Sequence, residues 1–230
     1  MRNTPDSLMI FAAGFGTRMG ALTADRPKPL VEVGGQTLLD RALGLARDEG
    51  LGRIVVNTHY RGDQIARHLQ GSGVAISDEA DAILETGGGL RQALPLLGAD
   101  TVMTLNPDVV WHGPNPLSML RAAWDPVRMD ALLLCVDPKA AVGRLGAGDF
   151  DPDAEGRLTR GGQVIYGGAQ VIATDDLSAI PDPAFSLNRV WDLMIARGRL
   201  FGLTYPGQWC DVGRPEGIGM AEGMLGADHV

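Results

Sequence analysis

The sequence is poor in cysteine, and its two cysteines do not form a recognisable site. Cys135 and Cys210 lie far apart in the chain, and neither belongs to a C-x-x-C pair. Structural zinc sites use such closely spaced pairs, so none is indicated here. Cys135 lies inside an apolar run, which favours a small core residue over one half of a disulfide.

Positive charge is also scarce. The chain has 20 Lys and Arg residues against 28 Asp and Glu, which gives a formal net charge of -8 at pH 7. This balance argues against a general nucleic-acid binder, which needs a basic face. A phosphate ligand must therefore be attracted by locally placed cations or by a metal ion, and not by the overall field of the protein.

Long apolar runs are absent, and the first seven residues, M-R-N-T-P-D-S, are polar. These features predict neither a signal peptide nor a transmembrane helix, and so a cytoplasmic protein with no membrane partner. No internal repeat and no hexapeptide array typical of a left-handed β-helix is found. We therefore predict a single domain over residues 1–230, long enough to bury a core, without a C-terminal β-helix domain.

Two common phosphate-binding motifs are missing. A Walker A loop needs Gly-Lys-Ser/Thr, which does not occur, and a dinucleotide loop needs G-x-G-x-x-G. Here the third glycine, Gly20, comes one residue late because Met19 holds the expected place. Glu32 lies near the distance of an acidic ribose ligand, but it precedes a Gly-Gly turn. These departures disfavour a dinucleotide-dependent oxidoreductase, the alternative from a different enzyme class.

What the chain does contain is a glycine-rich loop with cations beside it. Residues 8–30 read L-M-I-F-A-A-G-F-G-T-R-M-G-A-L-T-A-D-R-P-K-P-L. The apolar run predicts a buried parallel strand, and Gly14 and Gly16 then allow backbone amides to approach a ligand. Arg18 adds a guanidinium, and Lys28 adds an ammonium group held between two prolines. This combination predicts a polyphosphate-binding loop.

Apolar runs and helical patterns alternate through the first half of the chain. Strands are predicted over residues 53–57, 74–77, 101–105, 131–136 and 200–205, and helices over residues 37–50, 61–70, 90–97, 115–124 and 186–197. The alternation predicts an α/β fold, a three-layer α/β/α sandwich with a mostly parallel, Rossmann-like sheet. Residues 137–170, rich in Gly and Asp, predict a lid-like insertion of small antiparallel strands.

Two further stretches lie where ligands collect, at the carboxyl ends of strands. Asp108 follows a predicted central strand, where a hard oxygen ligand for Mg²⁺ would meet the phosphates delivered by the opening loop. Three glycines after Glu85 and Thr86 precede a helical pattern, which predicts an open turn whose bare backbone faces a ligand.

Together these motifs resemble the sugar-phosphate nucleotidyltransferases. The matching segments are A-A-G-x-G-T-R-M…P-K-P-L, E-T-G-G-G-x-x-x-A-L-P-L-L-G and W-x-D-V-G, and they span nearly the whole chain. Within that superfamily the chain looks most like the short bacterial N-acetylmuramate α-1-phosphate uridylyltransferases of peptidoglycan recycling. The resemblance implies a nucleotide-diphospho-sugar transferase (GT-A-like) fold, Mg²⁺ as cofactor, and transfer of UMP from UTP to N-acetylmuramate 1-phosphate.

The resemblance also implies roles for individual residues. The catalytic residues would be Arg18, Lys28 and Asp108, and the metal ligands Asp108 and Asp211. The sugar would be contacted by Asp149, Gly168 and Asn188. The nucleotide would be bound by Ala12, Ala13, Gly14, Gly16, Thr17, Arg18, Lys28, Glu85, Thr86, Gly87, Gly88 and Asp108. Pro107 departs from the family pattern, which has glycine before the first aspartate.

Several alternatives stay open at this point. Mannose 1-phosphate with GTP is the second choice of substrates, because close relatives within the superfamily use it. A non-catalytic nucleotide-binding domain is a third hypothesis, and Pro107 is its best support. The sequence is compatible with a monomer or a homodimer.

Overall fold

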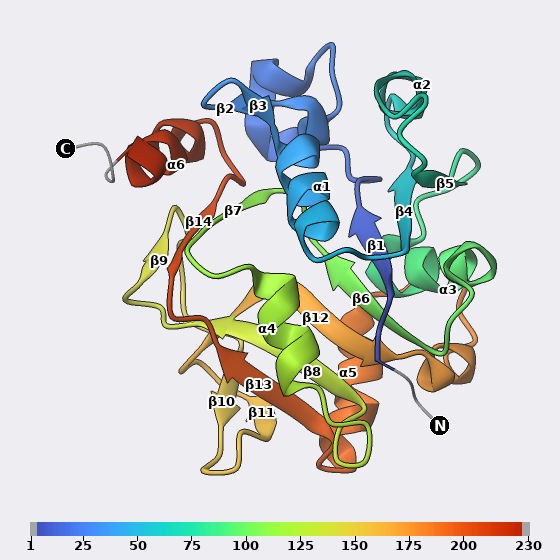
Figure 1. Ribbon diagram of the computed structural model, residues 1–230, viewed down its shortest axis with the longest axis vertical. Coiled ribbons are helices and arrows are strands. Elements are labelled where there is room, and N and C mark those ends of the chain that lie inside the picture. The colour runs from blue at the N-terminus through green and yellow to red at the C-terminus, as the bar shows by residue number, and fades with distance from the viewer. Residues whose placement is uncertain (1–3, 227–230) are drawn as a thin grey trace.

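The computed structural model describes residues 4–226, and a seven-stranded sheet forms its centre (Figure 1). The order across the sheet is β13-β8-β12-β6-β1-β4-β5. Only β12 runs antiparallel to its neighbours, β6 and β8. The strands are β1 (Ser7–Phe11), β4 (Arg53–Thr58), β5 (Ala75–Asp78), β6 (Thr101–Leu105), β8 (Ala131–Val136), β12 (Ile165–Ala173) and β13 (Leu200–Thr204).

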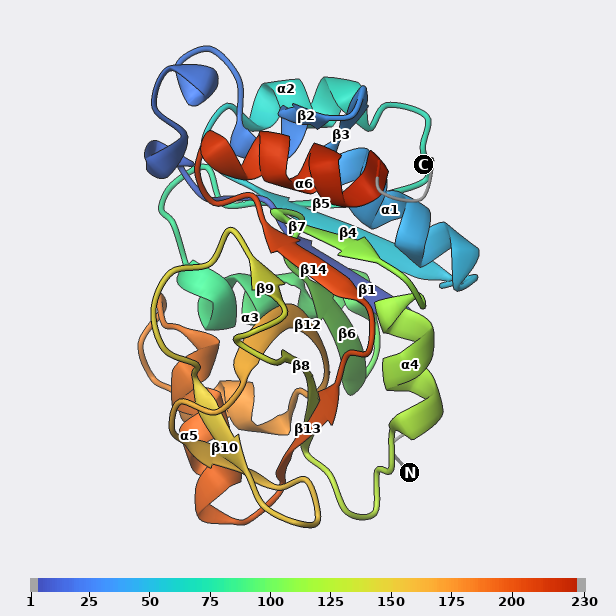
Figure 2. The same cartoon turned by 90° about the vertical axis from the view of Figure 1, so that its left-hand side faces the viewer.

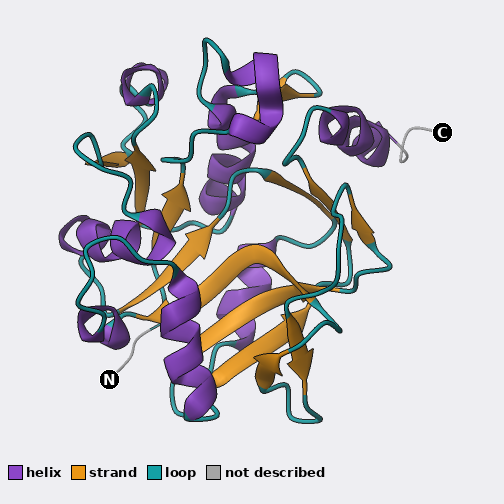
Figure 3. Ribbon diagram, turned by 180° about the vertical axis from the view of Figure 1, so that it is seen from behind, coloured by secondary structure: helices purple, strands orange, loops and turns teal. Residues whose placement is uncertain are grey.

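Helices cover both faces of this sheet. The α-helices are α1 (Leu38–Asp48), α2 (Gly62–His68), α3 (Glu85–Leu97), α4 (Pro116–Ala123), α5 (Leu187–Ala196) and α6 (Glu216–Gly226). Helices α1 and α4 lie in front of the sheet in Figure 1, whereas α3 and α5 cover the face seen in Figure 3. The predicted three-layer sandwich with a mostly parallel sheet is therefore confirmed.

Each face of the sheet has its own hydrophobic core, because strands buried on both sides are apolar along their whole length. Strand β1 contributes Leu8 and Ile10 to one core and Met9 to the other, as alternating side chains require. Leu39 and Leu43 of α1 belong to the first core, and α3 and α5 supply the second. Cys135 is buried in the second core as a free thiol, as predicted, and burial raises its pKa to about 12.

Short strands build three small sheets outside the centre. They are β2 (Glu32–Val33) with β3 (Gln36–Thr37), β10 (Phe150–Pro152) with β11 (Leu158–Arg160), and a sheet of β7 (Val109–His112), β14 (Gln208–Asp211) and β9 (Ala141–Val142). Helix α6 lies beside β14 (Figure 2), and a third apolar cluster joins the two through Cys210 and Ala221. The strand that follows β6, β7, is thereby joined to β14 and α6 near the C-terminus.

Side chains cap the starts of α1 and α5. The Thr37 hydroxyl accepts a hydrogen bond from the Asp40 amide, and the Ser186 hydroxyl accepts one from the Asn188 amide. Such caps satisfy amides that a helix leaves unpaired in its first turn. None of the helices formed by residues 4–226 is long and apolar enough to cross a membrane.

The glycine-rich segment differs from the prediction of an open turn. Helix α3 begins at Glu85, so Gly87, Gly88 and Gly89 lie buried within its first turns. The amides of Gly87 and Gly88 both donate to the carbonyl of Phe185, at 2.8 and 3.1 Å. These glycines therefore allow a neighbouring chain segment to pack closely, and their backbone is not bare.

The predicted lid range of residues 137–170 also needs a correction. Within this range, β10 and β11 form an antiparallel pair. Short 3₁₀ helices lie outside the range, over Thr17–Thr23, Lys28–Leu30 and Asp175–Ala179. From Ile165 onward the chain forms β12, a central strand of the main sheet. Periodicity did not distinguish a buried antiparallel strand from a lid strand, because both are short apolar runs between glycines. Residues 1–3 and 227–230 of the predicted domain lie outside the described residues.

We expect Gly87→Ala to destabilise the fold and Gly44→Ala to stabilise it. A Cβ at Gly87 would lie 2.3 Å from the Phe185 ring, whereas a Cβ at Gly44, inside α1, meets nothing within 4 Å. Overpacking costs about 1–3 kcal/mol, and replacing an unhindered helix glycine gains about 0.5–1 kcal/mol. Urea unfolding of the two variants measures both effects. Equal stabilities would contradict the packing described for α3.

Candidate active site

Strand register brings the predicted site residues to one edge of the sheet. Ile10 of β1 lies opposite Leu105 of β6, and Phe11 lies opposite Asn57 of β4. The loops that follow β1 and β6 therefore leave the sheet side by side. Parallel strands collect ligands at this carboxyl edge, and the opening loop and Asp108 both lie there.

A cavity of about 330 Å³ lies at this edge. Ten of the twelve residues predicted to bind nucleotide line it, namely Ala12, Ala13, Gly14, Gly16, Thr17, Arg18, Lys28, Glu85, Thr86 and Asp108. Gly87 and Gly88 are not among its lining residues, since they lie in α3 with their amides bonded to Phe185. The structure thus gathers the predicted nucleotide site except for those two glycines.

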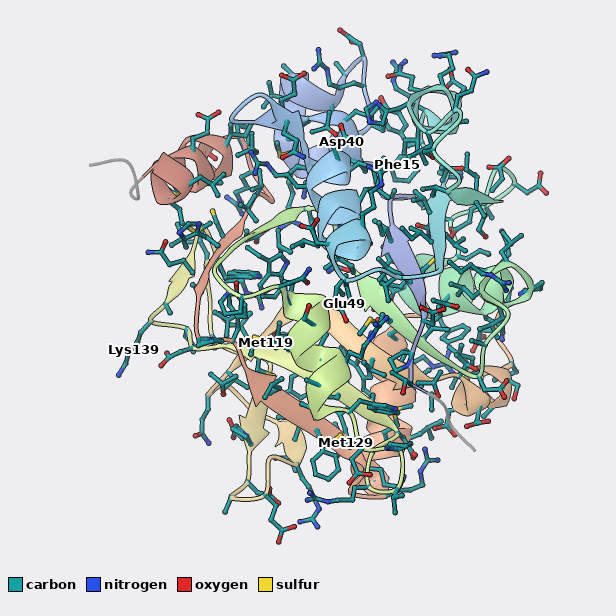
Figure 4. All side chains as sticks on the ribbon, viewed as in Figure 1. Phe15, Asp40, Glu49, Met119, Met129 and Lys139 are labelled. Atoms are coloured by element: carbon teal, nitrogen blue, oxygen red, sulfur yellow. The ribbon has the colours of Figure 1, made fainter. Side chains whose placement is uncertain are left out.

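The opening loop is shaped by one glycine. Gly16 has φ 65°, and a Cβ at this position would lie 2.8 Å from Cβ of Lys28. Only glycine combines this left-handed conformation with such a close approach. Phe15, just before it, is 50% exposed and makes an edge-to-face contact with His59 beyond the end of β1 (Figure 4). The loop therefore turns its backbone inward and its aromatic side chain outward.

Lys28 and Asp108 form an ion pair at the floor of the cavity. Nζ of Lys28 donates to Oδ2 of Asp108 at 2.6 Å, and the two side chains are 11% and 29% exposed. Pro27, in an extended conformation, and Pro29 fix the short 3₁₀ helix that begins with the lysine. A charge-assisted hydrogen bond of this length, little exposed to water, links the opening loop to the exit of β6.

Asp211 lies beside this pair. It faces Val109 across the β14–β7 ladder, and the amide of Val212 donates to the carbonyl of Asp108 at 2.9 Å. A Cβ at Gly213 would lie 2.8 Å from Oδ1 of Asp211 and 3.1 Å from Nη1 of Arg18. The structure thus brings both predicted carboxylates and the loop arginine together.

The electrostatics of Asp211 reflect this crowding. Burial raises the pKa of its carboxyl above the usual value, and the neighbouring Asp108 carboxylate raises it further. The positive charges of Lys28, Arg18 and Arg144 oppose the rise. A buried carboxyl whose ionisation a neighbouring carboxylate disfavours, with cations at its margin, is suited to a positively charged ligand.

The donor set matches a magnesium ion. Among residues 4–226 no cluster of three or more His, Cys, Asp or Glu side chains is suited to a metal. The candidate site instead offers the two carboxylates of Asp108 and Asp211. Mg²⁺ characteristically binds one or two carboxylates while keeping positions for water and substrate phosphates. The pattern differs from a structural metal site, which the protein would enclose completely.

Sequence reasoning missed a buried polar pair that lines the same cavity. Asn57 accepts a hydrogen bond from the Ala12 amide at 2.7 Å and donates to Glu79 at 2.6 Å. Glu79, which is 3% exposed, also accepts from the Leu84 amide at 2.9 Å. The pair fixes the opening loop and the start of α3 relative to each other. The only signal in the sequence was a buried strand that ends in Asn-Thr, and this signal does not identify the hydrogen-bond partner of the asparagine.

A second cavity of about 260 Å³ adjoins the first. Phe11, Thr86 and Asn106 line both. Of the residues predicted to contact the sugar, Asp149 and Asn188 line this second cavity. Gly168 does not, but it lies behind Asn106, whose amide donates to the Gly168 carbonyl at 2.7 Å.

The second cavity has an aromatic wall and one ion pair. Trp191 makes edge-to-face contacts with Phe150 and Tyr166, at 5.8 and 4.9 Å between ring centroids. Trp191 is mostly buried, yet it also lines the cavity. Arg144, which the sequence analysis did not single out, pairs with Asp149 at 3.0 Å. Apolar faces with a polar rim suit a ligand that has both kinds of surface, such as a sugar.

Comparisons with known proteins agree with this geometry. Residues 8–172 match the model of the MobA-like NTP transferase domain. The chain belongs to this family. It is 38% identical to the N-acetylmuramate alpha-1-phosphate uridylyltransferase of Caulobacter vibrioides, over 98% of this chain and 99% of that protein. The enzyme of the same name from Neisseria meningitidis is 31% identical, over 95% and 98%.

The fold of this NTP transferase domain also matches solved structures. HddC from Yersinia pseudotuberculosis, crystallised with GMP-PN, superposes with a TM-score of 0.75 over 95% of this chain and 99% of that chain, at 22% identity. These relationships confirm the resemblance read from the motifs and the prediction of a nucleotidyltransferase enzyme. The roles of individual site residues stay predictions.

We expect Asp211→Asn to raise the melting temperature at neutral pH in the absence of added metal. Because the folded-state pKa of Asp211 is raised above the usual 3.8, its contribution to stability is complete below pH 3.8 and is lost as pH rises through the folded pKa. The neutral amide avoids that loss. Thermal unfolding of the variant and the wild type across pH 3 to 8 measures the difference.

The gain from Asp211→Asn should vanish at the acid end of this range. Asp108→Ala serves as the contrasting variant, because it leaves the little-exposed Lys28 without its partner and should lower the melting temperature at neutral pH. A melting temperature unchanged or lowered by Asp211→Asn at neutral pH would contradict the described environment.

Proposed function

We propose that this NTP transferase domain condenses UTP with N-acetylmuramate 1-phosphate to give UDP-N-acetylmuramate and pyrophosphate. One observation carries the proposal: a cation-bearing cavity and a sugar-sized, aromatic-walled cavity adjoin at Asn106, Thr86 and Phe11, beside two carboxylates. The choice of substrates follows the relatives from Caulobacter and Neisseria, whose names describe this reaction.

In this proposal the triphosphate occupies the first cavity and the sugar the second. An oxygen of the sugar phosphate attacks the α-phosphorus, a new P–O bond forms, and the bond to the β-phosphate oxygen breaks to release pyrophosphate. The nucleophile is already ionised, so no covalent enzyme intermediate and no general base is needed. The protein contributes placement and charge neutralisation, as in other phosphoryl transfers.

Each charged group has a proposed task. Lys28 exchanges its contact with Asp108 for the α-phosphate, and Arg18 holds the departing β- and γ-phosphates. The amides of the loop from Ala13 to Thr17 supply further donors to the triphosphate. Hydrogen bonds of Asn57 and Glu79 hold this loop in position relative to α3. At the start of α3, Glu85 and Thr86 border the proposed site of the base.

Asp108 and Asp211 are proposed to hold Mg²⁺, which would supply charge neutralisation to the reacting phosphates. The position of Asp211 at the end of β14, next to the Asp108 carbonyl, supports this assignment. The Pro107 that precedes Asp108 leaves the peptide bond trans, and the ion pair with Lys28 forms. The formation of this ion pair beside Pro107 supports a catalytic domain over one without catalytic activity.

Lys28→Ala is expected to lower the rate of pyrophosphate release about a hundredfold to a thousandfold, equivalent to about 3–4 kcal/mol of lost transition-state stabilisation. Asp108→Asn should also nearly abolish release. The chain provides a matched control, because Lys139 is its only other lysine and is exposed on the surface. Lys139→Ala should keep the wild-type rate. Full activity in both Lys28→Ala and Asp108→Asn would refute the site assignment.

A matrix of four nucleoside triphosphates against several sugar 1-phosphates tests the substrates. With Mg²⁺ and inorganic pyrophosphatase, phosphate release reports each productive pair. UTP with N-acetylmuramate 1-phosphate should give the highest kcat/KM. A preference for GTP with mannose 1-phosphate would replace the proposed substrates within the same class of reaction. No release from any pair would contradict the proposed function.

A further inference from the structure

The second cavity contains one cation that the proposed mechanism has not used. Arg144 is the only cationic residue among the described residues that line this cavity, and Asp149 is the only acidic one. Nη2 of Arg144 lies 3.0 and 3.2 Å from the two carboxylate oxygens of Asp149. The ion pair is partly buried, with side chains 30% and 34% exposed.

The hydrogen bonding of Arg144 is incomplete. Its Nε is shielded from water and has no hydrogen-bond partner. A guanidinium stays charged at any ordinary pH, so a buried donor on it without an acceptor is unfavourable. Asp149, by contrast, also accepts from the Tyr166 amide at 2.9 Å and keeps that partner whatever Arg144 does. An incoming anion would therefore supply the hydrogen-bond acceptor that Arg144 lacks, and Asp149 would still keep its hydrogen bond from the Tyr166 amide.

The backbone places Arg144 near Asp211, the second candidate carboxylate. Strand β9 runs parallel to β14, with Val142 opposite Cys210, so the chain enters the Arg144 loop beside Asp211. Gly143, at φ 75°, passes so close that a Cβ there would lie 2.5 Å from the Asp211 carbonyl oxygen. Arg144 thus lies in the loop that directly follows β9, the strand next to the one that carries the second carboxylate.

We propose that Arg144 binds the phosphate group of the acceptor sugar 1-phosphate. The inference rests on the proposed function and assigns the acceptor phosphate a site distinct from Lys28 and Arg18. The guanidinium fork matches phosphate oxygens in a bidentate geometry, and it holds the attacking group at the boundary between the cavities. Asp149 keeps the arginine in place before the acceptor arrives.

The location of Arg144 favours binding of the acceptor's phosphate group over binding of a carboxylate on the sugar. An acceptor with its sugar in the second cavity must extend its phosphate toward Asp211 and the first cavity, and Arg144 lies on that side. The other nearby guanidinium, Arg160, is bound to Asp192 and Asn188 and stacks over the Phe150 ring. Arg160 therefore has its own partners, and it is not one of the described residues that line the cavity.

Binding measurements with three probes test the assignment. N-acetylmuramate 1-phosphate, N-acetylglucosamine 1-phosphate and phosphate-free N-acetylmuramate are titrated while tryptophan fluorescence is followed, because Trp191 lines the cavity. Arg144→Ala should weaken both sugar phosphates about 10- to 100-fold and leave the phosphate-free sugar unchanged. Arg144→Lys should recover part of the loss. Arg157→Ala is the matched control and should leave all three affinities unchanged, because Arg157 lies in the turn between β10 and β11, pairs with Glu155 and is outside the cavity.

Steady-state kinetics give a second readout. Arg144→Ala should raise KM for the sugar phosphate by a similar factor, while KM for UTP stays near the wild-type value; unchanged melting temperature establishes that the variant folds. A loss confined to N-acetylmuramate species would assign Arg144 to the sugar's carboxylate and overturn the proposal, as would wild-type affinity for both sugar phosphates. If the wild type binds no sugar phosphate and releases no pyrophosphate, the proposed function itself fails.

Discussion

The ion pair between Lys28 and Asp108 joins the two halves of the candidate site. Lys28 belongs to the loop that follows β1, and Asp108 to the turn that follows β6. The 2.6 Å contact forms only because Gly16 lets the loop pack against the lysine stem and because Pro27 and Pro29 fix its backbone. Lys28 and Asp108 both line the first cavity together with Arg18, and the β14–β7 ladder brings Asp211 beside them.

An acidic protein that handles acidic substrates must concentrate its cations. With a net charge of -8, the chain has no long-range attraction for phosphates. The structure compensates locally: Arg18 and Lys28 line one cavity, Arg144 lines the next, and all three cations act on the carboxyl of Asp211. In a site partly shielded from water, such short-range interactions are much stronger than the same charges on the surface.

The sequence predicted the layers and the opening loop, because those follow from periodicity and from a motif placed at a strand end. The family resemblance implied that Asp211 would join Asp108. The sequence did not predict that Gly87 and Gly88 are helical. Glycine disfavours helices, and the packing against Phe185 that overrides this preference involves a segment about one hundred residues away. Arg144 and the Asn57–Glu79 pair were missed for the same reason, since their meaning comes from partners distant in the chain.

The most direct measurement is a crystal structure of the protein with a non-hydrolysable UTP analogue, Mg²⁺ and a sugar 1-phosphate. The account predicts that Nζ of Lys28 leaves Asp108 and lies within hydrogen-bond distance of an α-phosphate oxygen, with the sugar in the adjoining cavity. A complex in which Lys28 stays bound to Asp108 while the triphosphate binds away from the opening loop would contradict it.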